Sequence, residues 1–177
     1  MEIVSAVSLR RETEGDLEFL KDLYAASRER ELAVLVDWGD DQKREFLEQQ
    51  FNAQRSHYLK HYADARFDII ERSGSPIGRL YVAELTQEIR LMDIALMPAA
   101  RNCGTGGKIC SEIMARATRL GKIVSLHVED DNPAKRLYER LGFVAVGDVT
   151  FYKLMHWCPP GLAHISEAIA AQLKTAS

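Results

Sequence analysis

A glycine-rich turn between an apolar strand and a helix constrains this sequence more than any other feature. The predicted strand Leu91–Met97 leads into the turn Arg101–Gly107, and a helix predicted over Gly104–Leu120 begins within that turn. Glycine allows backbone conformations that a side chain would obstruct, and the first amide groups of a helix have no intrahelical acceptors. Amide groups that converge in this way can hold a diphosphate. The turn therefore indicates a nucleotide-like cofactor, with a glycine-rich turn that binds nothing as the structural alternative.

Two better-known phosphate motifs do not fit the spacing. A nucleotide P-loop follows the pattern GxxxxGK[ST], but Asn102 stands at its first glycine and Ile109 at its Ser/Thr. A dinucleotide fingerprint follows GxGxxG, and Ile109 again replaces the last glycine. What remains is an Arg-x-x-Gly-x-Gly turn after a strand.

Composition excludes several classes of partner. The chain has 177 residues, the size of one domain, and its formal charge of −3 offers no basic surface for nucleic acid or an anionic membrane. No apolar run approaches the ~20 residues of a membrane span, and the N-terminus lacks the apolar core of a signal peptide. The cysteines Cys103, Cys110 and Cys158 follow no metal or disulfide spacing. We expect a cytoplasmic protein that binds neither nucleic acid nor membrane.

Helical and strand periodicities alternate along the chain and predict an α/β (α+β) fold, a mixed sheet flanked by helices. We expect an N-terminal domain over residues 1–157 and a tail over 158–177, which would form a short helix through Ile165, Ala168, Ile169 and Leu173. The expected elements are a weak strand Val7–Arg10, a helix after the cap Thr13–Asp16, a helix Asp41–Tyr62, a hairpin of Phe67–Glu71 and Ile77–Val82 around the turn Ser73–Pro76, strand Glu88–Met97, helix Gly104–Leu120, strand Ile123–Glu129, helix Pro133–Leu141, and strands Phe143–Val146 and Phe151–Met155.

Three motifs in this order resemble the GNAT superfamily of N-acetyltransferases. They are the turn Arg101–Gly106, the segment Asn132-Pro133-Ala134, and the segment Tyr138–Phe143, which reads Tyr-Glu-Arg-Leu-Gly-Phe. The elements of that superfamily would span roughly Ser8 to Trp157. The resemblance implies a mostly antiparallel sheet with one splayed parallel strand pair, acetyl-coenzyme A or another acyl-CoA as donor, and an amine as acceptor. One departure is that Asn102-Cys103 replaces the commoner Gly-Arg/Lys pair.

The resemblance also assigns the residues that would contact the donor. Backbone groups of the strand end would pair with the pantetheine arm, the turn would hold the pyrophosphate, and Asn132 would contact the arm. Asn132-Pro133 is equally a good helix cap, and the two roles are compatible. The full set expected at the cofactor is Leu96, Met97, Arg101, Asn102, Cys103, Gly104, Thr105, Gly106, Gly107, Asn132 and Tyr138.

Two catalytic roles follow from the same resemblance. Tyr138 matches the tyrosine near the cofactor sulfur and would protonate the departing thiolate; the alternative is a packed core aromatic. Strand alternation places His127 on one face with Ser125 and Glu129, and its position five residues before Asn132 resembles the catalytic glutamate of ribosomal-protein alanine N-acetyltransferases. His127 is the candidate base, with a hydrogen-bonded structural histidine as the alternative.

Other polar groups receive a structural interpretation. Asp93 is a second candidate base, but a carboxylate in an apolar strand needs a partner if it is buried, and we interpret it as structural. His57 and His61 lie one helical turn apart without an evident third ligand, so no metal site is expected. The acidic loop around Trp38 either attracts a cationic acceptor or supplies a helix cap through Asp40.

The sequence thus predicts an N-acetyltransferase that moves an acetyl group from acetyl-CoA to a primary amine by direct attack in a ternary complex. The alternative is a non-catalytic acyl-CoA-binding sensor or scaffold with the same fold. Small metabolites, antibiotics, peptide N-termini and protein lysines all stay open as acceptors, and so does a homodimer. The acidic loop around Trp38 favours a small amine.

Overall fold

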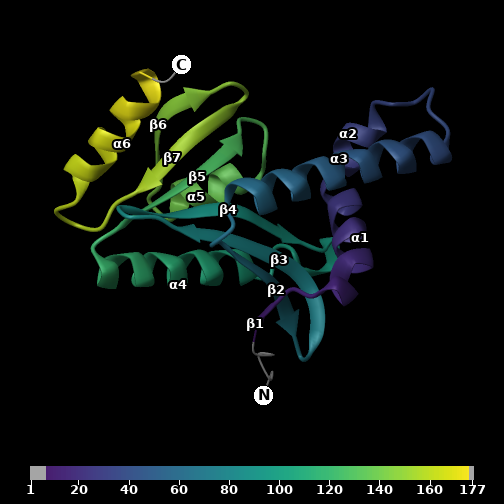
Figure 1. Ribbon diagram of the computed structural model, residues 1–177, viewed down its shortest axis with the longest axis horizontal. Coiled ribbons are helices and arrows are strands. Elements are labelled where there is room, and N and C mark those ends of the chain that lie inside the picture. The colour runs from purple at the N-terminus through teal and green to yellow at the C-terminus, as the bar shows by residue number, and fades with distance from the viewer. Residues whose placement is uncertain (1–6, 176–177) are drawn as a thin grey trace. The chain divides into compact units, whose positions relative to one another are not determined.

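The computed structural model describes the backbone of residues 7–175 and the side chains of residues 7–171 (Figure 1). The chain divides into two compact units. The first unit comprises Met1–Tyr81 and Asp93–Cys103, and the second comprises Val82–Met92 and Gly104–Ser177. Within residues 7–175, every helix is too short or too polar to cross a bilayer.

Seven strands form one sheet in the order β1-β2-β3-β4-β5-β7-β6. The sheet is mostly antiparallel, and β4 and β5 form its parallel pair, which confirms the expected mixed sheet flanked by helices. The elements are β1 (Val7–Arg11), α1 (Leu17–Ser27), α2 (Glu29–Ala33), α3 (Asp40–His61), β2 (Arg66–Arg72), β3 (Ser75–Glu84), β4 (Glu88–Leu96), α4 (Thr105–Leu120), β5 (Ile123–Glu129), α5 (Ala134–Arg140), β6 (Val144–Val149), β7 (Tyr152–Trp157) and α6 (Ala163–Thr175), with short 3₁₀ turns at Glu14–Asp16 and Pro98–Ala100.

The hairpin between β2 and β3 is tighter than predicted. Its turn is the pair Ser73-Gly74, and both residues have positive φ angles, 53° and 77°. Two consecutive residues of that kind match the right-handed twist of a hairpin, so the strands can pair directly on either side. Ser75 and Pro76, expected in the turn, are instead the first residues of β3.

The core of the first unit joins α1, α3 and β2. Its buried members are Leu20, Tyr24, Phe51 and Ile69, and the ring of Tyr24 meets that of Phe51 edge-on at 5.8 Å. Phe51 is the one residue of α3 that is fully buried. The half-buried Leu47 packs against this core, and the ring of Tyr58, also half-buried, meets that of Tyr81 edge-on at 5.9 Å.

In the second unit, helices cover both faces of the strands. Figure 1 shows α4 on one side of β4, β5 and β7 and α6 on the other. Helix α4 buries Ile109, Cys110, Ile113 and Ala117. Leu120, the last residue of the helix, is exposed, whereas Cys110 lies beside Ile109 on the buried face. The helix ends at a left-handed Gly121 with φ 64°, a conformation that glycine adopts without strain.

The parallel pair β4–β5 is short. Its register runs from Glu88 opposite Ile123 to Leu91 opposite Leu126, although β4 continues to Leu96 and β5 to Glu129. On its other edge, β5 stays paired with β7 as far as Glu129 opposite Tyr152. The ladder thus ends partway along both strands, as expected for a splayed pair.

Candidate active site

The turn before α4 contains two left-handed residues. Asn102 has φ 59°, and Gly104 has φ 78° and ψ −6°. Asparagine tolerates this region better than other residues with a side chain, because its short amide can bond locally. This explains how Asn102 can stand where the resemblance expects glycine: the backbone conformation is one that both residues adopt.

The start of α4 is open. The first bond that closes the helix runs from the Lys108 N–H to the Gly104 carbonyl, at 3.0 Å, so the amides of residues 105–107 come before any intrahelical acceptor. A Cβ placed on Gly104 would meet no atom within 4 Å. A Cβ on Gly106 would lie 3.4 Å from Leu137 of α5, so a small residue there lets α4 and α5 approach closely. The first turn of α4 therefore has no protein atom close to the Cβ position of Gly104.

The end of β4, in the first unit, is already engaged by neighbouring groups. Met97 donates its N–H to the Ile77 carbonyl at 2.9 Å, and its own carbonyl accepts the Ala100 N–H at 2.8 Å. Because backbone groups alternate along a strand, those of Leu96 point to the opposite edge. The Arg101 guanidinium donates from Nε to the Leu96 carbonyl, at 2.9 Å, and from Nη2 to the Ala26 carbonyl, at 3.2 Å. Arg101 thus tethers the strand end to α1.

Asn132 and Tyr138 flank the short helix α5. The side-chain Oδ1 of Asn132 accepts the Ala134 N–H at 2.9 Å, so the capping role exists, and the amide NH₂ end is not used in that bond. Tyr138 is buried, with its ring tilted against Phe143 at 5.7 Å. Its packing role is therefore present in the structure, and the proton-donor role stays a prediction.

His127 lies on β5 opposite Leu154 of β7, and its side chain is exposed. It is the first residue of β5 beyond the end of the ladder with β4. Surrounding protein atoms displace water from the imidazole and lower the pKa of His127 below its ordinary value, and the positive charge of Arg90 lowers it further. The negative charge of Glu88 acts in the opposite direction. An imidazole with a lowered pKa is neutral at physiological pH and can accept a proton.

Asp93 has the partner that a buried carboxylate requires. Its Oδ2 lies 2.6 Å from Nη2 of Arg79, and the exposed fractions of the two side chains are 15% and 4%. The same guanidinium nitrogen donates to Gln54 of α3 at 2.9 Å. These contacts favour the structural interpretation of Asp93.

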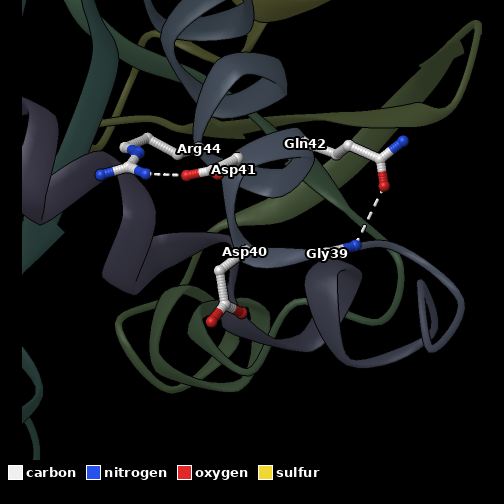
Figure 2. Close-up of a pocket in the computed structure, with 5 residues that line it drawn as sticks. All are labelled: Gly39, Asp40, Asp41, Gln42 and Arg44. Carbon is white, nitrogen blue, oxygen red and sulfur yellow. Dashed lines mark hydrogen bonds and ion pairs between the residues drawn. The ribbon is translucent and has the colours of Figure 1, made fainter.

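The acidic loop leads into a shallow hollow at the start of α3, lined by Gly39, Asp40, Asp41, Gln42 and Arg44 (Figure 2). The cap of this helix is Gly39, whose N–H donates to Oε1 of Gln42 at 3.0 Å. The expectation that Asp40 caps the helix was therefore wrong, since Asp40 is its first residue. Asp41 is ion-paired with Arg44, as Figure 2 shows. Among residues 7–175, His57 and His61 are not part of any group of three metal-ligating side chains.

Sequence reasoning missed Arg90 and Glu88, which lie on the same sheet face as His127. Their signal was the alternation Glu88, Arg90 on one strand and Ser125, His127 on the next. That alternation predicts a shared face only once the register of β4 against β5 is known.

Solved structures of other proteins have the same fold. One is the PaiA N-acetyltransferase of Thermoplasma acidophilum in complex with coenzyme A, at 15% identity and a TM-score of 0.66, covering 87% of this chain and 99% of that one. Another is a histone acetyltransferase HPA2 and related acetyltransferase of Corynebacterium glutamicum, at 21% identity and 0.60, covering 88% and 97%. A spermidine N-acetyltransferase chimera of Vibrio cholerae SpeG and hSSAT has 22% identity and 0.56, covering 86% and 93%.

At these identities the similarity concerns the fold alone. Among curated protein sequences, none matches this chain. A family model, described as the acetyltransferase (GNAT) family, matches residues 18–143, which include the turn, the Asn132 segment and Tyr138. This match covers well over half of the chain and agrees with the observed sheet and its parallel pair. The chain therefore belongs to the GNAT family of acetyltransferases.

Proposed function

We propose that this protein is an N-acetyltransferase that transfers the acetyl group of acetyl-CoA to a primary amine in a ternary complex. The observation that carries the proposal is the left-handed, unobstructed Gly104 at the start of α4. Backbone N–H groups at such a helix start favour a diphosphate, because they donate hydrogen bonds and stand at the positive end of the helix dipole. Family membership and a related fold with coenzyme A bound support the same donor.

The remaining donor contacts follow from the groups already placed. The backbone of Leu96 and Met97 would bind the pantetheine arm, and the arm would compete there with the bonds of Met97 to Ile77 and Ala100 and with the bond from Arg101 to the Leu96 carbonyl. The NH₂ end of Asn132 would contact the same arm, and Arg101 would hold the strand end in place. Asn102, Cys103 and Thr105 would contribute through the backbone of the turn.

The chemistry requires one proton acceptor and one proton donor. The acceptor amine loses a proton to the imidazole of His127, and its nitrogen lone pair attacks the thioester carbonyl. The nitrogen of the tetrahedral intermediate then releases its second proton to water, the intermediate collapses as the C–S bond breaks with its electron pair on sulfur, and Tyr138 protonates the thiolate. The acceptor proposed is a small cationic amine, because the segment before α3 carries Asp37, Asp40 and Asp41. One of the proteins with a similar fold is named a spermidine N-acetyltransferase, and spermidine is a small cationic amine.

The donor half is tested by calorimetry with acetyl-CoA on paired glycine variants. Gly104 and Gly121 cap the two ends of α4, both have positive φ, and a Cβ at either meets nothing within 4 Å. Gly104→Ala should weaken acetyl-CoA binding by about tenfold or more, a loss of roughly 1.4 kcal/mol. Gly121→Ala places the same strain at the other end of the helix and should leave the affinity unchanged. Unimpaired binding by Gly104→Ala would refute the proposed diphosphate site at the start of α4.

The catalytic half is tested by thiol release across a panel of amines. We expect turnover with at least one small primary amine, and Tyr138→Phe should lower kcat while the affinity for acetyl-CoA changes little. Tyr24→Phe, which alters a buried tyrosine of the first unit's core, is the matched control and should keep normal turnover. Tight acetyl-CoA binding with no turnover on any amine would instead favour the sensor or scaffold alternative.

A further inference from the structure

A cluster of polar side chains lies on the α6 side of the second unit's strands. Arg90 of β4 is opposite Ser125 of β5, and Ser125 is opposite His156 of β7, so the three share one face of the sheet. His156 is fully buried and its Nδ1 lies 2.7 Å from Oγ of Ser166 on α6. The members of this cluster are Glu88, Arg90, Ser125, His127, His156 and Ser166.

Arg90 is held in place within the cluster. Its Nη2 donates to Oε1 of Glu88 at 2.6 Å, and its Nε lies 3.5 Å from Oγ of Ser125. The Arg90 side chain is only 20% exposed, and that of Glu88 is 6% exposed. Contacts from two strands therefore restrict the guanidinium, and its charge is only partly screened by water.

His127 is the next residue after Ser125 on the same face of β5. Diagonal neighbours on adjacent strands lie about 7–8 Å apart, and a poorly screened charge acts over that distance. Arg90 is thus a fixed positive charge on the same sheet face as His127, near the end of the ladder between β4 and β5, and its charge acts on the imidazole. The other ionisable side chains of these strands on this face are Glu88 of β4, Glu129 of β5, and His156 and Tyr152 of β7, of which Tyr152 is opposite Glu129.

We propose that Arg90 is a positioning residue for acetyl transfer: its guanidinium, clamped by Glu88 and Ser125, keeps the imidazole of His127 unprotonated and ready to take a proton from the acceptor amine. The inference rests on the proposed function, in which His127 is the base. In the step concerned, the amine N–H bond breaks, its proton passes to the imidazole, and its electron pair stays on the nitrogen that attacks the thioester.

Arg90 and Glu88 carry opposite charges, so removing one or the other should shift the pKa of His127 in opposite directions. Arg90→Gln removes the positive charge that disfavours the imidazolium form of His127. The carboxylate of Glu88 stays and favours that form, so the pKa of His127 should rise. Glu88→Gln keeps the shape of the side chain but removes its negative charge, so the effect of Arg90 on His127 grows. The proposal therefore predicts opposite shifts from two variants of a single ion pair.

The experiment is an NMR titration of the histidine rings in the full chain, with His127→Gln used to assign the His127 signal. Arg90→Gln should shift the His127 titration to higher pH, Glu88→Gln should shift it to lower pH, and Arg90→Lys should restore it toward the wild type. Arg116→Gln removes an arginine that pairs with Glu84, and it should cause no shift. An unmoved His127 titration in Arg90→Gln and in Glu88→Gln overturns the inference.

A second readout separates this inference from the function on which it rests. With an amine acceptor, the acid limb of the kcat/KM profile should follow the His127 titration in each variant. If the NMR titration moves as predicted but the acid limb stays fixed, Arg90 still sets the charge of His127, and the role of His127 as base is wrong.

Discussion

Each of the two units of the chain has a cluster of charged side chains buried against the sheet. The clusters differ in which ionisable side chains they contain. In the first unit, the acids are paired with arginines, which carry a permanent charge. In the second unit, one arginine and one acid share a face with two imidazoles. The first arrangement is insensitive to pH near neutrality, and the second is not.

The first-unit cluster is a connected network around Tyr81. Arg79 pairs with Asp93, and its guanidinium lies 5.1 Å from the ring centre of Tyr81. The Tyr81 hydroxyl donates to Oε2 of Glu12 at 2.7 Å, and Oε1 of Glu12 accepts from Arg55 at 2.6 Å. Burial raises the pKa of Tyr81 above its ordinary value, so its hydroxyl stays a donor. We infer that this network holds α3 against β3 and β4 within its unit.

Each cluster also contains a buried atom without a partner. Among the described residues, Nε of Arg79 lacks a hydrogen bond in the first unit, as do Oε2 of Glu88 and Nε2 of His156 in the second. Incomplete bonding therefore does not separate the two regions. What separates them is the kind of cation: burial holds the imidazole of His156 toward its neutral form, whereas the guanidinium of Arg79 keeps its charge.

The largest effect is expected from breaking the first-unit network. Arg79→Met leaves the carboxylate of Asp93 mostly buried without its cation, and the free energy of unfolding should fall by about 3–5 kcal/mol. Chemical denaturation measures this loss, and adding Asp93→Leu to the same chain should recover part of it. Arg116→Met, which removes an exposed pair with Glu84, should cost less than about 1 kcal/mol. Similar losses of stability in Arg79→Met and Arg116→Met would contradict the expected difference between a buried and an exposed ion pair.

Backbone packing offers a second contrast between the units. A Cβ on Gly78 of β3 would lie 2.3 Å from the Ala95 carbonyl oxygen and 2.7 Å from Cδ2 of Leu96, so β3 and β4 cannot accept it without moving. Gly78→Ala should lower stability by about 1–3 kcal/mol. Gly147→Ala, in β6 of the second unit, meets nothing within 4 Å and should be neutral or stabilising. Thermal unfolding compares the pair, and a neutral Gly78→Ala would count against the close approach.

The bond between α6 and the second-unit cluster should contribute less. Ser166→Ala removes the hydroxyl that meets Nδ1 of His156, and we expect a loss of about 1 kcal/mol in denaturation experiments. The control is Thr118→Ala, because the Thr118 hydroxyl bonds to the Met114 carbonyl on an exposed part of α4. That variant should change stability little. Equal effects from both would show that the buried bond contributes no more than an exposed one.

The smallest expected effect is a difference in pH dependence. Burial lowers the pKa of His156 below its ordinary 6.5, so the unfolded chain binds a proton at higher pH than the folded chain. Stability should therefore fall as the pH drops through about 6.5, and this fall should be shallower in His156→Gln. In the first unit, the bond from Arg10 lowers the pKa of Asp16 below its ordinary 3.8, so stability from Asp16 is present above that value and is lost only in stronger acid.

Denaturation at pH 7.5 and 5.5 distinguishes these two contributions. Asp16→Asn should have the same slope as the wild type over that range and differ only below it. A wild-type slope in His156→Gln would mean that His156 does not take part in the acid response of the second unit.

Local features of the fold could be predicted because they depend on neighbouring residues. Strand Ile123–Glu129 was predicted with the bounds that the structure has, and the helix ends at Gly121 and Gly142 have the positive φ expected of such caps. Helix α2 was not predicted: it has five residues, Glu29–Ala33, and none of them is buried, so it leaves no apolar period in the sequence. The turn residues of the candidate site were identifiable for the same local reason.

Features that depend on distant segments could not be predicted. The sequence suggests that Ser125 is a solvent-facing polar residue, yet it is fully buried. It lies opposite His156, and His156 is contacted by Ser166 of α6, a segment far from Ser125 in the sequence. The partners of Asp93 and His127 also come from other strands. Alternation within one strand assigns a face to each residue, but it does not say what covers that face.

The division of the chain has a practical consequence for dissecting it. The boundary between units falls inside β3, between Tyr81 and Val82, inside β4, between Met92 and Asp93, and again at Cys103-Gly104. Neither half is one uninterrupted stretch, so no single cut releases either of them intact. Replacing one unit with the equivalent unit of another family member would require joining the two sequences inside strands β3 and β4. The joined strands would then have to keep the hydrogen-bond register that they have with their neighbours.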